Sequence, residues 1–126
     1  MDPAGVRLAV LADPLRLIEV WEDAVPVILV DAAVGGPPGR VLVHDLNTTP
    51  LPDSGAAVTS SHGVSLASVL ELSRHLGTLP PCLVLVTVAG VSYELGAAPQ
   101  QEVLDAVPRA AAQVVRLLGV RRAATG

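Results

Sequence analysis

Short apolar runs separated by Gly, Pro and small polar residues recur along the 126-residue chain. The segment VILVD at 27–31 is apolar on both faces of an extended chain, as expected of an interior strand in a parallel sheet. The runs VRLAVLA at 6–12, RVLVHDL at 40–46 and CLVLVTV at 82–88 predict three further strands. The pattern therefore predicts four strands.

Helices are predicted between these strands. Asp13 and Pro14 follow the first run in the order of an N-cap residue and a first helical residue. A second helix is predicted over 66–76, where Ser65 caps the start and Gly77 stops the end.

The last helix is predicted over about 99–118, with a frayed tail beyond it. Pro108 lies inside this span, so we expect it to kink or divide the helix. The larger apolar side chains at helical spacing are expected on its inner face: Val103, Val107, Val114 and Leu118.

The resulting order, β-α-β-β-α-β-α, predicts one α/β domain over 1–126. We expect a three-layer α/β/α sandwich with a mixed, mostly parallel sheet. The turn GGPPG at 35–39 is short. It predicts that the strand at 40–46 runs antiparallel to its predecessor in a hairpin.

Composition removes several classes of function. No apolar run approaches the roughly 20 residues of a membrane span, and no signal peptide is visible, so a cytoplasmic protein is expected. The net charge is −4 and the chain has one Trp and one Tyr, which argues against nucleic-acid binding. A single cysteine, Cys82, excludes an internal disulfide and is expected to be buried.

Two polar residues occupy positions where chemistry is expected. Asp31 ends the apolar run at 27–31, and ligand sites of open α/β sheets lie beyond the carboxyl ends of strands. Capping of the following turn is the structural alternative for Asp31. His62 follows a polar loop at 47–61 and precedes a helix, although a surface histidine would look the same. His44 and His75 are weaker candidates, interpreted as structural or solvent-facing.

Familiar catalytic motifs are missing. The sequence contains no Gly-x-Ser-x-Gly nucleophile elbow. It also contains no Walker loop, no Gly-x-Gly-x-x-Gly and no His-x-x-x-His pair.

Several segments together resemble the nickel–iron hydrogenase maturation proteases: VILVDAAVGGPPGRV, Ser-Ser-His-Gly, LVTVAGV and Ala-Val-Pro-Arg. The resemblance covers about residues 6–118. It implies an endopeptidase that removes the C-terminal tail of the hydrogenase large-subunit precursor after nickel insertion. It also implies that Asp31 and His62 contact the nickel carried by that substrate, with no resident cofactor. The implied partner is the precursor, with no nucleic acid or membrane.

The chain departs from this family at its start. Members open with a Gly-x-Gly-Asn strand and loop and an acid that supplies the first metal-contacting side chain, followed by a helix. These have no counterpart here, and Asp13 is the one nearby acid that could partly substitute.

Three interpretations therefore stay open. The recorded sequence could begin late within an active endopeptidase. The short form could itself be an inactive remnant or a non-catalytic module that binds a partner protein, and we expect little or no proteolysis from it. The third interpretation is a small α/β interaction domain without metal chemistry.

Overall fold

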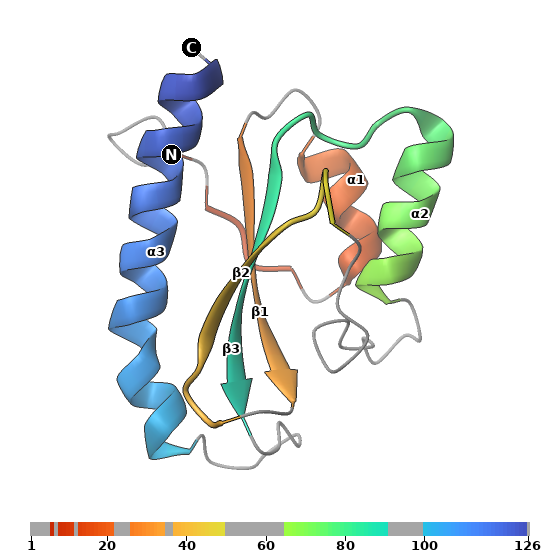
Figure 1. Ribbon diagram of the computed structural model, residues 1–126. Coiled ribbons are helices and arrows are strands. Elements are labelled where there is room, and N and C mark those ends of the chain that lie inside the picture. The colour runs from red at the N-terminus through yellow and green to blue at the C-terminus, as the bar shows by residue number, and fades with distance from the viewer. Residues whose placement is uncertain are drawn as a thin grey trace.

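The computed structural model describes residues 6, 8–11, 13–21, 26–34, 37–49, 65–90 and 100–125. Its helices cover the two faces of a sheet, with α3 on one face and α1 and α2 on the other (Figure 1). The α/β/α sandwich predicted from the sequence is thus confirmed. The elements, in chain order, are a 3-10 helix Pro14–Arg16, α1 Leu17–Val20, β1 Val27–Val34, β2 Val41–Asp45, α2 Leu66–Leu76, β3 Leu83–Gly90 and α3 Gln101–Thr125.

The sheet is mixed, and its described strands lie in the order β1-β3-β2. β1 is parallel to β3, and β2 is antiparallel to β3. β2 therefore runs opposite to β1, as predicted, but the predicted hairpin is wrong because β3 lies between them. The chain from β1 to β2 crosses the end of β3, where the Gly39 N–H donates to the Ala89 carbonyl at 2.7 Å.

β3 is the centre of the molecule because every one of its residues is buried. Its alternating side chains supply both hydrophobic layers. Leu83 and Leu85 join the cluster under α1 and α2, which includes Trp21, Leu66, Val69 and Leu70. Val84, Val86 and Val88 join the cluster under α3, which includes Ala106, Ala110 and Leu117.

The strand predicted over 6–12 is not formed by the described residues of that segment. Leu8 and Val10 are 90% and 94% exposed. An apolar run becomes a strand only where its backbone groups find a partner edge. The described strands β1, β2 and β3 pair only with one another, so the local pattern overstated this segment.

α2 begins and ends as its local signals predict. The Ser65 hydroxyl accepts a hydrogen bond from the Ser68 N–H, and Gly77 closes the helix with a left-handed φ of 72°. Leu66, Val69 and Leu70 face the core. Leu76, the last residue of the helix, is 58% exposed.

α3 is one continuous helix from Gln101 to Thr125, so Pro108 does not divide it, and the predicted fraying beyond 118 is wrong for the residues up to 125. Pro108 and Leu104 are exposed, so the Leu104 carbonyl that loses its helical partner at Pro108 lies on the water-facing side.

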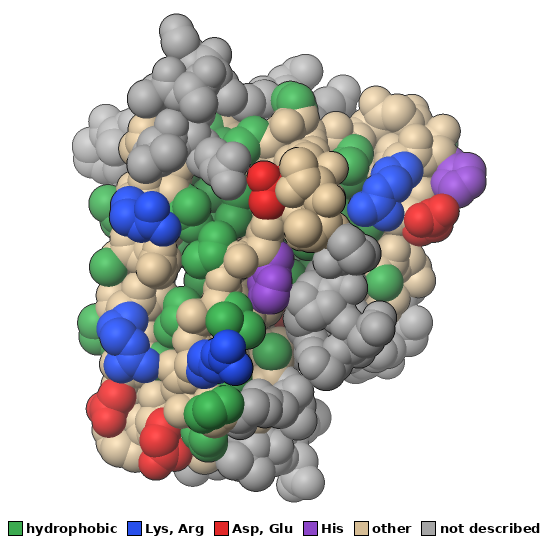
Figure 2. Space-filling view, in the orientation of Figure 1, with side chains coloured by type: hydrophobic (Ala, Val, Ile, Leu, Met, Phe, Trp, Pro, Cys, Tyr) green, Lys and Arg blue, Asp and Glu red, His purple; other side chains and the backbone are tan. Residues whose placement is uncertain are grey.

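The acidic side chains of α3 lie near its N-terminal end, with arginines further along the helix (Figure 2). This order suits the helix dipole.

The inner face of α3 also differs from the prediction. Val107 is 55% exposed, whereas Ala106 and Ala110 are 0% and 6% exposed. Val103 and Val114 pack partly against the core as predicted. The inward face of α3 therefore places Ala106 and Ala110 in one core cluster with Val84, Val86 and Val88 of β3.

Candidate functional site

Asp31 lies within β1 rather than at its end. It is followed by Ala32, Ala33 and Val34, which continue the parallel pairing with Val88, Ala89 and Gly90 of β3. The prediction that Asp31 ends the strand is therefore wrong, because the longer partner strand keeps β1 extended for three more residues. Asp31 stands opposite Thr87 in this register.

The side chain of Asp31 shares the sheet face that α1 and α2 cover. Val27, Leu29 and Ala33 pack partly into the cluster on that face. Since side chains alternate along a strand, Asp31 projects to the same side. The carboxylate thus lies between Leu29 and Ala33 of its own strand and opposite Thr87 of β3.

One carboxylate oxygen of Asp31 has a clear structural task. Asp31 Oδ1 accepts a hydrogen bond from the Ala32 N–H at 2.8 Å. The Val27 N–H points toward β3, so by alternation the Ala32 N–H points to the other edge of β1. The carboxylate therefore satisfies an edge amide. The structural alternative considered for Asp31 was a backbone contact in the following turn. The contact seen here is also to the backbone, but it lies within the strand.

Partial burial changes the acidity of Asp31. Desolvation raises the pKa of its carboxyl above the ordinary value of 3.8, and the hydrogen bond from Ala32 partly opposes this rise. Buried acids with raised pKa values are found at functional sites, which makes Asp31 a candidate site residue. Ion-pair or cap roles usually lower the pKa of an acid, and neither is seen at Asp31 among the described residues.

His44 makes a contact that the sequence analysis missed. Its Nε2 lies 3.4 Å from the Thr87 hydroxyl oxygen. Burial lowers the pKa of the His44 imidazole, which favours the neutral ring. The sequence did offer a signal, because Thr87 is the one hydroxyl residue within the buried run of β3.

His62 lies outside the described residues, as do Ser60 and Ser61. The predicted meeting of Asp31 and His62 therefore stays a prediction. Asp13, the acid considered as a partial substitute for the family's first acid, serves as a helix cap. Its Oδ1 accepts a hydrogen bond from the Leu15 N–H at 3.0 Å.

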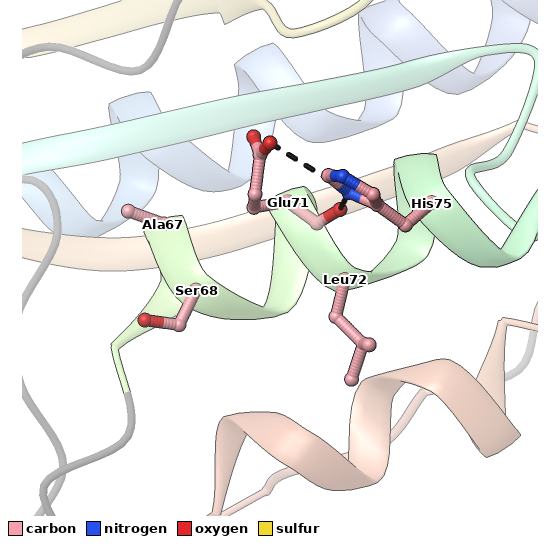
Figure 3. Close-up of a pocket in the computed structure, with 5 residues that line it drawn as sticks. All are labelled: Ala67, Ser68, Glu71, Leu72 and His75. Carbon is pink, nitrogen blue, oxygen red and sulfur yellow. Dashed lines mark hydrogen bonds and ion pairs between the residues drawn. The ribbon is translucent and has the colours of Figure 1, made fainter.

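A shallow hollow of about 520 Å³ lies on the outward side of α2, lined by Ala67, Ser68, Glu71, Leu72 and His75 (Figure 3). His75 forms an ion-pair contact of 3.7 Å with Glu71 when protonated. These side chains face away from the core side of α2, whereas Asp31 lies on the sheet. The hollow is therefore separate from the Asp31 face, and His75 is solvent-facing, as predicted.

Other features narrow the chemistry available to the described residues. They contain no group of three or more His, Cys, Asp or Glu side chains arranged to hold a metal ion. Cys82 is buried and 8% exposed, as predicted. None of the described helices is long and apolar enough to span a lipid bilayer.

The family model for hydrogenase maturation proteases (HycI) matches residues 12–117, which is most of the chain. The matched span contains the three described strands, including β1 with Asp31. It also contains α2 and most of α3. The chain belongs to the hydrogenase maturation protease family.

The solved structure of the hydrogenase maturating endopeptidase HybD from E. coli has a similar fold. The TM-score is 0.64 and the sequence identity is 25%. The match covers 85% of this chain and 66% of the HybD chain, so this sequence spans slightly less than two thirds of that relative. No curated protein sequence matches the chain.

Proposed function

We propose that this protein acts in the maturation of nickel–iron hydrogenase as an endopeptidase that removes the C-terminal tail of the nickel-loaded large-subunit precursor. Family membership supports the general assignment. The observation that carries it to a particular site is the carboxylate of Asp31, held partly buried on the sheet face. The reaction is proposed to take place in the cytoplasm.

In this proposal the nickel is part of the substrate. Asp31 offers one carboxylate oxygen that receives no hydrogen bond from the described residues. Imidazole is a common nickel ligand, and His62 is proposed as the imidazole that joins Asp31. The two side chains would read the metal in the precursor, so that only the nickel-loaded form is cut.

The test compares processing of a nickel-loaded large-subunit precursor by the protein purified from its native cell and by two variants, Asp31→Asn and His62→Ala. Tail removal is followed by intact mass spectrometry. We expect both variants to remain folded by circular dichroism and to lose tail removal. Normal processing by either variant would contradict its assigned role.

A parallel measurement separates this proposal from a non-catalytic binding module. The 126-residue chain is incubated with the same precursor, and both binding and cleavage are measured. Stable binding without cleavage, in the native protein as well as in this chain, would favour the module. Nickel-dependent cleavage by the native protein supports the endopeptidase.

A further inference from the structure

A row of polar side chains crosses the three described strands on the face toward α1 and α2. Asp31 on β1 stands opposite Thr87 on β3. On β2, His44 pairs with Leu85, so it is a diagonal neighbour of Thr87 on the same face. Adjacent strands are about 4.8 Å apart, which brings such neighbours within reach of one another.

Thr87, in the middle of the row, is within hydrogen-bond distance of His44 at one end. Thr87 is only 2% exposed, and a buried hydroxyl needs a hydrogen-bond partner. Its partner among the described residues is His44 Nε2, at 3.4 Å. Because Nε2 is at the far end of the ring, this contact turns the imidazole over β3, toward the strand that carries Asp31.

The hydroxyl of Thr87 can link the two ends chemically. When His44 Nε2 carries the proton it donates to Thr87, and the threonine hydrogen is then free to donate toward the Asp31 side. Asp31 itself uses one oxygen for the Ala32 N–H. A ligand bound at the other oxygen would therefore lie beside a hydroxyl and an imidazole.

We propose that His44 contacts the substrate beside Asp31, and that Thr87 is a positioning residue for its imidazole. The inference rests on the proposed function, since the substrate is the nickel-bearing end of the precursor. From the sequence His44 was only a weak candidate, interpreted as structural or solvent-facing, and Thr87 was not a candidate; their contact spans 43 residues of chain. The competing explanation is that His44 only satisfies a buried hydroxyl.

Four variants separate these explanations. Thr87→Val removes the hydroxyl at nearly constant shape, and Thr87→Ser keeps it. His44→Gln removes the imidazole, and His75→Gln is the control for loss of a surface imidazole. The measurements are kcat and KM for tail removal from the nickel-loaded precursor, together with the ring ¹H–¹⁵N spectrum of His44.

We expect kcat/KM to fall at least tenfold in His44→Gln and Thr87→Val, and to stay within threefold of wild type in Thr87→Ser and His75→Gln. The His44 ring signals should change in Thr87→Val and be retained in Thr87→Ser. Unchanged kinetics in a folded His44→Gln variant would overturn the proposal. So would a normal kcat/KM in Thr87→Val when its His44 signals have changed.

A second readout distinguishes failure of this inference from failure of the proposed function. If the wild-type protein purified from its native cell does not process the precursor, the proposed function fails, and Ni²⁺ alone is then added to the His75→Gln protein. Broadening of the His44 ring signals that is lost on adding Asp31→Asn supports a shared site. If the His44 ring signals do not broaden, or broaden equally in the Asp31→Asn variant, the proposal that His44 contacts the substrate beside Asp31 is overturned.

Discussion

Gly39 lies against the first turn of α3, so closely that a Cβ built on it would be 2.6 Å from the carbonyl oxygen of Glu102. Its φ of 85° is in the left-handed region as well. Two independent constraints therefore act at one position in the turn between β1 and β2. This turn carries the chain across the end of β3 and fixes where β2 begins.

The first prediction compares Gly39→Ala with Gly77→Ala. Gly77 also has a positive φ, of 72°, but no atom lies within 4 Å of a Cβ placed there. Both variants pay a left-handed backbone cost of roughly 1–2 kcal/mol. Gly39→Ala should lose a further ~1–3 kcal/mol because the facing atom is backbone.

Urea unfolding of both variants measures this difference. Gly77→Ala serves as the control for the backbone cost alone, since both residues are in the same dihedral region. Equal losses of unfolding free energy in the two variants would show that α3 does not press on the turn.

The second prediction concerns Arg109, in the Ala-Val-Pro-Arg segment. Its guanidinium donates a 2.7 Å hydrogen bond to the Gly39 carbonyl, and so ties α3 to the same turn. Arg109→Ala should lower the unfolding free energy by about 1 kcal/mol, because the bond is charge-assisted and only partly buried.

Arg116→Ala is the matched control. The Arg116 guanidinium bonds only within α3 among the described residues, to Gln113 at 2.7 and 3.2 Å. Its loss should change stability by no more than a few tenths of a kcal/mol, as is usual for exposed contacts. A loss equal to that of Arg109→Ala would refute a special role for the contact with Gly39.

Local chemistry predicted the parts of the fold that depend on one short segment. Ser65 and Gly77 delimit α2 because an N-cap hydroxyl and a left-handed glycine act within a single turn. Asp13 caps its short helix for the same reason. The apolar run at 82–88 predicted a strand, and β3 forms there. The interior position was predicted for the run at 27–31 and is wrong for the described sheet, in which β1 lies at an edge and β3 is central.

The missed features all depend on partners far away in the chain. β1 extends past Asp31 because β3 continues beside it. The residues of one strand do not show how long its partner strand is. α3 turns Ala106 and Ala110 into the core cluster that it shares with β3. Periodicity favoured the larger valine at 107. The contact of His44 with Thr87 joins strands that the predicted hairpin would have kept apart.

The third prediction uses a buried hydroxyl without a partner. Ser73 on α2 is 0% exposed, and its Oγ has no hydrogen-bond partner among the described residues. Ser73→Ala should raise the unfolding free energy by about 1 kcal/mol, because it removes an unsatisfied polar group and adds a better helix former.

Ser68→Ala tests whether helix propensity alone explains such a gain. Ser68 lies on the same helix but is exposed, and its Oγ contacts the Ser65 hydroxyl at 3.1 Å. We expect a change near zero. A stabilisation of Ser68→Ala equal to that of Ser73→Ala would mean that burial of the hydroxyl has no part in the effect. Thermal and urea unfolding give the comparison.

The fourth prediction follows from the raised pKa of Asp31. Desolvation raises the pKa of this carboxyl in the folded protein above its ordinary value of 3.8, which applies to the unfolded chain. The folded state then binds the proton more tightly than the unfolded state. The stabilising contribution is full below pH 3.8 and is lost as the pH rises through the folded pKa.

Asp31→Asn should therefore be more stable than wild type at neutral pH, since it removes an ionised, partly buried group while its side-chain oxygen can still accept from the Ala32 N–H. The advantage should shrink as the pH falls, and disappear below 3.8. Urea unfolding across this pH range measures it. Should the variant prove less stable than wild type at neutral pH, the carboxylate would be a structural anchor of β1. A gain in stability together with a loss of tail removal indicates that the protein keeps an unfavourable charge there for its function.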